Sequence, residues 1–176
     1  TGPDLAARDL VGVSGRRSEP GLLALPSSTA DVAAVLSACS DAGVPVIPLG
    51  GGTGLVDGTQ ADVGQVVISL ERLRGVESVD PVSKTMTVGA GTVLAEVHDA
   101  AAAHGLSFPV DLGARGSAQL GGLIATNAGG NGVVRFGMMR ENVLGLEAVL
   151  ADGTILESMN AMVKDNTGYD LKQLFF

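Results

Sequence analysis

The chain has 176 residues, of which 45% are apolar, and it carries 11 Lys and Arg against 19 Asp and Glu for a net charge of −8. This length and apolar content exclude a disordered tail and predict one domain or two small subdomains. The negative charge argues against nucleic acid as a partner, because it would repel a phosphate backbone. One cysteine and two histidines are too few for an internal disulfide or a closed zinc site.

Apolar runs along the chain are all shorter than the roughly 18 residues that a membrane-spanning helix needs. Residues 1–10 also lack the basic-then-apolar order of a signal peptide. We therefore expect no membrane span and a soluble protein in a reducing compartment, the cytoplasm.

The first part of the chain predicts α/β structure with buried strands. Residues 26–48 begin as a helix, because Ser28 and Asp31 are spaced like a capping box and apolar residues follow at helical intervals. Cys39 would lie on the apolar face of this helix as a buried, inert thiol. Strands are predicted at 44–48, 66–70 and 76–79.

The second part is expected to begin at the turn 80–84. Its predicted elements are a strand at 85–89, a helix capped by Thr92 and ended by Gly105, a short helix capped by Ser117, and a hairpin that turns at Asp152 and Gly153. We therefore divide the chain into an N-terminal segment (1–25), a first subdomain (26–80) and a second subdomain (81–176).

A glycine-rich loop at 48–55 follows a predicted buried strand. Successive backbone N–H groups can converge on an anion there, and a diphosphate is the natural ligand. A P-loop would require Gly-Lys-Ser/Thr where this chain has Leu55-Val56-Asp57, and a Rossmann loop would open directly into a helix. A merely flexible turn is the remaining alternative, at a large entropic cost for four glycines.

A second constellation of small residues covers 111–122 and continues at 126–130. Such residues let a planar ligand lie against the backbone, while Ser117, Thr126 and Asn127 can hydrogen-bond its polar edges. The alternative is tight helix packing through glycine. Two such loops in one small domain favour binding.

Other polar side chains are weaker candidates. His98 and His104 are expected at the surface or end of a helix. Arg115 and Arg135 border the glycine-rich loops and could contact a phosphate, although a solvated charge explains them equally well.

The two loops, together with the strand at 143–147, the turn at 150–154 and the segment 164–175, resemble the FAD-binding domain of the vanillyl-alcohol oxidase (PCMH-type) flavoprotein family. Within that family the motifs are most similar to the members that oxidise D-2-hydroxyglutarate, D-lactate and glycolate. The resemblance runs from about residue 26 onward. It implies an α+β fold of two α/β subdomains that hold an extended FAD between them.

Matched position by position, the resemblance implies two groups of cofactor-binding residues. The pyrophosphate loop would comprise Gly50, Gly51, Gly52, Thr53, Gly54 and Leu55. The second FAD segment would comprise Asp111, Gly116, Ser117, Gly121, Gly122, Thr126, Asn127 and Gly129. Family members that tether FAD covalently often carry a histidine in the first loop, where this chain has Thr53, so noncovalent FAD is implied. Lys164, Asn166 and Tyr169 match a further family motif, without an assigned role.

The leading hypothesis is the FAD-binding portion of an oxidoreductase that oxidises a D-2-hydroxy acid, such as D-2-hydroxyglutarate, D-lactate or glycolate, to the 2-oxo acid by hydride transfer to FAD. Family members continue into a substrate domain that binds the acid, often with a divalent metal. We therefore expect the second subdomain to be C-terminally incomplete, the chain to hold no catalytic residue or metal site, and the chain alone to be inactive. A noncatalytic flavin- or nucleotide-binding subunit and an inactive truncated module stay open as alternatives. A homodimer is one option for assembly that the sequence does not decide.

Overall fold

The computed structural model describes residues 14–176, which divide into two compact units. Unit 1 holds the described residues up to Leu73 together with Val149–Ile155, and unit 2 holds Arg74–Ala148 and Leu156–Phe176. Residues 1–13, which include the stretch without signal-peptide order and half of the predicted N-terminal segment, lie outside the described residues. From residue 14 to the end, no helix combines the length and apolar character needed to cross a bilayer.

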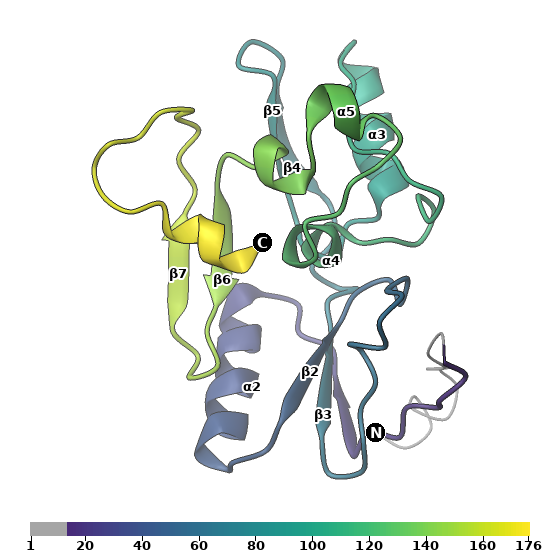
Figure 1. Cartoon of the computed structure of the whole chain (residues 1–176). Helices are drawn as coiled ribbons and strands as arrows, with labels where there is room; N and C mark the ends of the chain where they lie inside the picture. Colours follow the sequence, from purple (N-terminus) through teal and green to yellow (C-terminus); the bar gives the residue numbers. More distant parts are fainter. Residues whose placement is uncertain (1–13) are drawn as a thin grey trace. The chain divides into compact units, whose positions relative to one another are not determined.

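Unit 1 is built around a three-stranded parallel sheet in the order β1-β3-β2 (Figure 1). The strands are β1 (Leu22–Ala24), β2 (Val46–Leu49) and β3 (Val66–Ser69), and helix α2 (Thr29–Asp41) connects β1 to β2. All four residues of β3 are buried, as expected for the central strand of a parallel sheet. The core of this unit consists of Leu23, Leu49, Ala61 and Val67, with Leu25 and Ile47 packed against it.

Helix α2 begins as the sequence predicts, with Ser28 as its N-cap. The Ser28 hydroxyl accepts a hydrogen bond from the Asp31 N–H at 3.1 Å. The Asp31 carboxylate returns to Ser27 and accepts from its N–H at 3.0 Å and from its hydroxyl at 2.9 Å. These bonds from Ser27 lower the pKa of Asp31. Cys39 is partly exposed, so the prediction that it is buried was wrong.

Strand β1 was missed by the sequence analysis, which left residues 1–25 without an element. Leu22, Leu23 and Ala24 pair in register with residues 66–68 of β3. A three-residue strand is too short to show a diagnostic alternation, and its partner lies more than 40 residues further along the chain. The pairing is therefore a long-range contact that the local sequence does not reveal.

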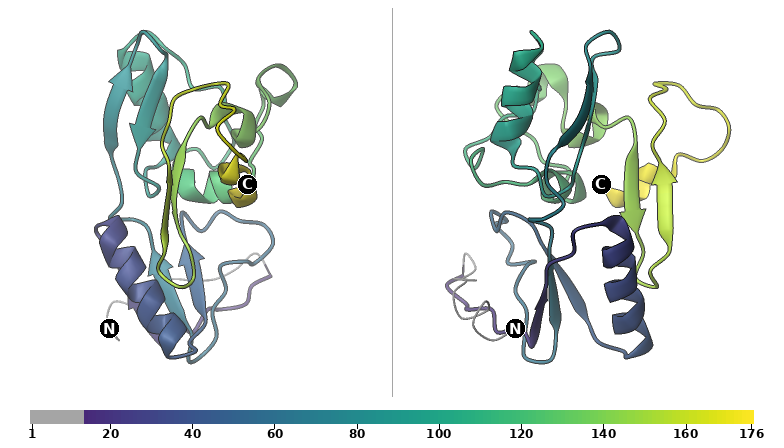
Figure 2. Two further views of the ribbon diagram at one scale, coloured as in Figure 1. Left: turned by 90° about the vertical axis from the view of Figure 1, so that its left-hand side faces the viewer. Right: turned by 180° about the vertical axis from the view of Figure 1, so that it is seen from behind.

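Unit 2 packs an antiparallel hairpin and several short helices around one core (Figure 2). Its elements are β4 (Val76–Asp80), β5 (Thr85–Val88), α3 (Leu94–Ala103), α4 (Leu120–Ala125), α5 (Val133–Phe136), and the 3₁₀ turns Met139–Asn142 and Leu171–Phe175. The buried core consists of Leu94, Val97, Val110, Ala118, Leu120, Leu123 and Met139, and Met86 and Val88 of β5 pack against it.

The division between the units falls after Leu73, earlier than the boundary after residue 80 that the sequence analysis proposed. Strand β4 pairs with β5, and both strands therefore belong to unit 2.

The predicted hairpin near the C-terminus is present as β6 (Leu146–Val149) and β7 (Ile155–Ser158). Its turn has Gly153 at φ +87°, in the left-handed region that favours glycine. The tip belongs to unit 1, where a Cβ on Gly153 would lie 2.7 Å from the Ala33 carbonyl oxygen of α2. Glycine at this turn is therefore required twice, by its dihedral angle and by the neighbouring helix.

Two predicted helix caps were wrong. Helix α3 starts after Val93, while the Thr92 hydroxyl is fully buried and bonds to the backbone of Gly75. Helix α4 starts after Gln119, and the N–H of Ser117 donates to Ala114 in a turn. An antiparallel bridge between Val93 and Gln119 joins the starts of both helices, so tertiary pairing replaces the predicted side-chain caps.

Candidate functional site

The first glycine loop leaves β2 of unit 1 and crosses residues 50–65 to β3 without forming a helix or strand. Gly52 has a φ of +66°, where a side chain would be strained. A Cβ on Gly54 or Gly58 would meet no atom within 4 Å. Neither a strained dihedral angle nor packing inside the unit therefore requires glycine at positions 54 and 58. Without side chains at these positions, a ligand could approach the backbone closely.

Side chains along this loop are exposed at Thr53, Leu55 and Val56. Leu55 is 80% exposed and Val56 is 85% exposed, although both are apolar. Adjacent exposed apolar side chains on a ligand-accessible loop provide a surface that a bound molecule would cover.

The second segment, in unit 2, is closed by a backbone contact between its two ends. The carbonyl oxygen of Asp111 accepts a hydrogen bond from the N–H of Asn131 at 2.9 Å. A Cβ on Gly130 would lie 2.0 Å from the same oxygen. Residues 111–131 therefore form a closed loop that carries α4, and Gly130, which the sequence analysis did not single out, is essential to its closure.

The start of α4 is held by hydrogen bonds to the segment before α3. The N–H of Gly121 donates to Ala90 at 2.8 Å, and that of Leu120 donates to Thr92 at 3.0 Å. Gly121 was predicted to bind the cofactor, and these bonds mean that its amide is engaged within the chain. Gly116 and Gly122 differ, because a Cβ on either would meet no atom within 4 Å. Tight packing within the unit therefore does not explain these two glycines.

Thr126 and Asn127 follow α4 and use their side chains within the unit. The Thr126 hydroxyl donates to the Gly122 carbonyl at 2.8 Å. Asn127 adopts a φ of +44°, and its side-chain oxygen accepts from the Arg140 N–H at 3.0 Å. Both side chains keep acceptor capacity for a further partner.

Gln119 was missed by the sequence analysis and is the N-cap residue of α4. Its side-chain oxygen is buried and accepts no hydrogen bond. Among residues 14–176 it is the one buried side-chain nitrogen or oxygen atom without a hydrogen-bond partner. Such a group typically costs about 1–3 kcal/mol until a donor reaches it. The sequence signal that could have identified Gln119 is its position between Ala118 and Leu120, a small and an apolar residue that are both buried.

Asp111 lies between two basic side chains. His98 Nε2 is 3.7 Å from one of its carboxylate oxygens, and Arg115 Nη1 is 3.6 Å from the other. The prediction of a surface position for His98 was wrong, because its side chain is only 12% exposed. His104 agrees with its prediction: it is exposed at the end of α3, with Nδ1 3.0 Å from the Ala100 carbonyl oxygen.

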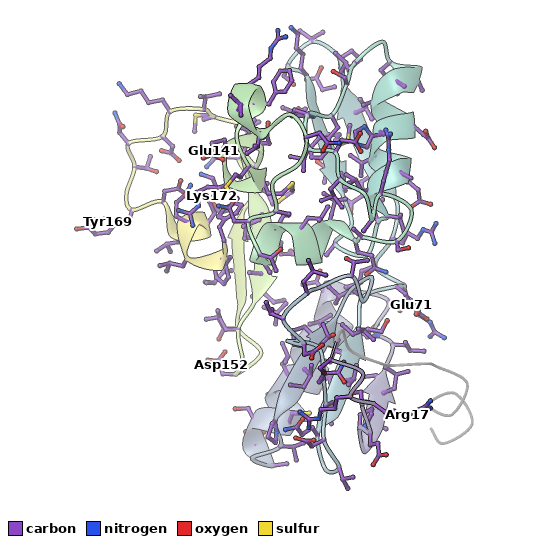
Figure 3. All side chains as sticks on the ribbon, turned by 45° about the vertical axis from the view of Figure 1, so that its right-hand side comes forward. Arg17, Glu71, Glu141, Asp152, Tyr169 and Lys172 are labelled. Carbon is purple, nitrogen blue, oxygen red and sulfur yellow. The ribbon has the colours of Figure 1, made fainter. Side chains whose placement is uncertain are left out.

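The residues of the C-terminal family motif are exposed. Tyr169 is 98% exposed and points away from the ribbon (Figure 3). Lys164 and Asn166 are likewise on the surface. Arg135 lies over the Phe136 ring, with its guanidinium carbon 4.9 Å from the ring centre, which is a cation–π contact at the surface.

The fold of this chain is that of a flavoprotein domain. The solved structure of 6-hydroxy-D-nicotine oxidase from Arthrobacter nicotinovorans matches 89% of this chain and 33% of its own length, with a TM-score of 0.76 and 23% sequence identity. Residues 20–158 match the family described as FAD binding domain. The chain belongs to this FAD-binding family, and its fold is the predicted α+β type. FAD is the cofactor of such a domain.

Curated relatives extend the similarity. The D-2-hydroxyglutarate–pyruvate transhydrogenase of Saccharomyces cerevisiae is 43% identical over 159 residues, which cover 90% of this chain and 32% of the relative. The mitochondrial D-2-hydroxyglutarate dehydrogenase of Bos taurus is also 43% identical over 159 residues, covering 90% of this chain and 29% of the relative. The chain thus spans about a third of the length of these relatives.

Proposed function

We propose that this chain is the FAD-binding part of a flavin-dependent oxidoreductase that oxidises a D-2-hydroxy acid to the corresponding 2-oxo acid. The observation that carries the proposal is the 43% identity, over 90% of the chain, to proteins named for D-2-hydroxyglutarate chemistry. D-2-Hydroxyglutarate is therefore the first substrate to test, with D-lactate and glycolate as the other members of the class.

Two features of the described residues fit FAD. Open glycine backbone at Gly54, Gly116 and Gly122 would permit close approach of the diphosphate and of a planar ring. The unpartnered oxygen of Gln119 would accept one of the donors that FAD carries. When bound, FAD supplies the acceptor for the hydride that leaves the substrate.

The residues proposed to hold FAD are those of the two glycine-rich segments. In the first loop, backbone N–H groups would face the pyrophosphate. In the second segment, Asp111, Ser117, Thr126 and Asn127 offer polar side chains, while Gly116, Gly122 and Gly129 leave room. The N–H of Gly121 already donates to Ala90, so Gly121 would contribute only by leaving space for the cofactor where a side chain would otherwise lie.

Binding of the acid is proposed to depend on the part of the protein that the relatives have beyond this domain. A carboxylate substrate needs arginine or lysine partners, and this chain carries a net charge of −8. Hydride transfer also requires the donor within roughly 3–3.5 Å of its acceptor, a constraint worth on the order of 7–11 kcal/mol. We therefore expect this chain to supply cofactor binding but not catalysis.

The proposal is tested first by ligand-dependent melting. FAD should raise the melting temperature well beyond the effect of FMN, because FMN lacks the adenylate half that would reach the first loop. Equal stabilisation by the two flavins would contradict an extended FAD site. Acid precipitation should release all of the yellow colour into the supernatant, as expected for noncovalent FAD with Thr53 in the first loop.

The catalytic part of the proposal is tested by anaerobic mixing with D-2-hydroxyglutarate, D-lactate and glycolate. The FAD-loaded chain should keep its flavin absorbance, whereas a protein that carries this domain at the length of its relatives should lose it with at least one acid. Bleaching by the isolated chain would contradict the proposed division of labour. FAD binding without reduction in the longer protein would favour the noncatalytic subunit instead.

Location and assembly complete the proposal. We expect the cytoplasm, whereas the Bos taurus relative is named as mitochondrial, and cell fractionation distinguishes the two. For assembly, a homodimer is the state to test against a monomer. Sedimentation velocity measures this assembly directly.

A further inference from the structure

His98 has an environment that its position on a helix does not explain. It lies on α3, yet its side chain is only 12% exposed, and its ring meets the Phe108 ring edge-on at 5.9 Å between centroids. His104, the other histidine of this region, lies at the C-terminal end of the same helix and is exposed, with its Nδ1 3.0 Å from the Ala100 carbonyl oxygen of its own helix.

The ring of His98 contacts the chain where it enters the second glycine-rich segment. Nε2 lies 3.0 Å from the carbonyl oxygen of Val110, a fully buried core residue. A carbonyl can only accept a hydrogen bond, so Nε2 must carry a proton. The same nitrogen lies 3.7 Å from the carboxylate of Asp111.

Asp111 has neighbours at both its backbone and its side chain, and the side chain is 42% exposed. Its backbone oxygen accepts from Asn131 and packs against Gly130, and its carboxylate lies between His98 and Arg115. Of these contacts, that of His98 is the one that comes from a different element, α3. The backbone at the start of the glycine-rich segment is therefore held by a side chain from outside that segment.

We propose that His98 is a positioning residue for FAD binding: its Nε2–H donates to the Val110 carbonyl, fixes the backbone immediately before Asp111, and so presents the second segment to the cofactor. This inference rests on the proposed function. It assigns a role to a residue outside both predicted groups of cofactor-binding residues. The role is indirect, because it acts through the backbone at Val110, the residue before Asp111.

The test separates the hydrogen bond from the bulk of the side chain. Glutamine and methionine have nearly equal length and volume, but only glutamine carries a donor near the position of Nε2. The full chain is prepared as wild type, His98→Gln and His98→Met, with His104→Gln and His104→Met as a matched control pair. FAD dissociation constants are measured by flavin fluorescence, together with the visible circular dichroism of bound FAD and the melting temperature of the ligand-free chain.

We expect His98→Gln to bind FAD within about threefold of wild type and His98→Met to bind about tenfold more weakly, with an altered visible dichroism band. Both His104 variants should match wild type. Equal FAD affinity and dichroism for the two His98 variants would overturn the proposal, as would an unfolded ligand-free His98→Met chain, which would make the role of His98 structural only. Failure of the wild type to bind FAD would overturn the proposed function as well, so the two failures are distinguishable.

Discussion

Gly130 and Asp111 approach each other so closely that a Cβ at position 130 would lie 2.0 Å from the Asp111 carbonyl oxygen. Replacing Gly130 with alanine must therefore move one backbone or the other and break the neighbouring hydrogen bond from Asn131. We expect Gly130→Ala to lower the free energy of unfolding by about 2 kcal/mol or more, measured by urea denaturation. Gly129→Ala is the control, because its Cβ would make only an ordinary contact of 3.4 Å with Val133. Equal stability of the two variants would contradict the observed closure.

Gly122 presents the opposite case, since it lies within α4 and a Cβ there would meet no atom within 4 Å outside the helix's own backbone. Alanine is a better helix former than glycine, so Gly122→Ala should raise the unfolding free energy of the ligand-free chain by roughly 0.5–1 kcal/mol. The same methyl group should weaken FAD binding if the cofactor approaches this backbone. Thermal unfolding and FAD titration of one sample measure both effects. A more stable variant with unchanged FAD affinity would remove Gly122 from the proposed site.

Thr92 is completely buried, and its hydroxyl satisfies the backbone of Gly75 twice. It accepts from the Gly75 N–H at 2.8 Å and donates to the Gly75 carbonyl at 3.1 Å. Thr92→Val keeps the shape but removes both hydrogen bonds and leaves the Gly75 N–H without the hydroxyl, so we expect a loss of about 2 kcal/mol in the free energy of unfolding. Thr92→Ser keeps the hydroxyl and loses one methyl group, for a smaller cost of about 1 kcal/mol. A serine variant less stable than the valine variant would show that packing, rather than hydrogen bonding, dominates here.

The ion pair between Arg74 and Glu96 joins the residues just before β4 to the first turn of α3. Hydrogen bonding from the Arg74 guanidinium holds the pKa of Glu96 below its ordinary value. A carboxyl with a lowered folded-state pKa stabilises the fold above its unfolded-state pKa, and this contribution is lost as pH falls through the folded-state value. Because both side chains are partly exposed, we expect Arg74→Gln to cause only a small loss of stability at pH 7, and this difference from wild type should shrink below about pH 4.

Urea denaturation across pH 3–7 checks this dependence, a range set by the ordinary glutamate pKa of about 4.3. Arg72→Gln serves as the control, because the Arg72 guanidinium contacts the Leu25 carbonyl, 3.5 Å away. Raising the salt concentration should also reduce the difference at pH 7. A difference independent of both pH and salt would show that Arg74 contributes through packing.

Local signals in the sequence located much of the fold. The Ser28 cap of α2, the continuous apolar strand β3 and the Asp152–Gly153 turn are each encoded within a few neighbouring residues, and each is present. The two glycine-rich segments were located in the same way, since an excess of glycine is visible without knowledge of the fold. Their residue-by-residue role in FAD binding stays a prediction.

What the sequence by itself determined is therefore the set of elements that neighbouring residues stabilise, together with membership of a family whose motifs are contiguous. Only the tertiary structure decided the pairing of β1 with β3, the use of Thr92 for Gly75 instead of a helix cap, and the contact of His98 with Val110 and Asp111. Each of these joins residues that are more than ten positions apart. Their energies depend on burial and on distances across the fold, and such contacts leave no periodic or spacing signal along the chain.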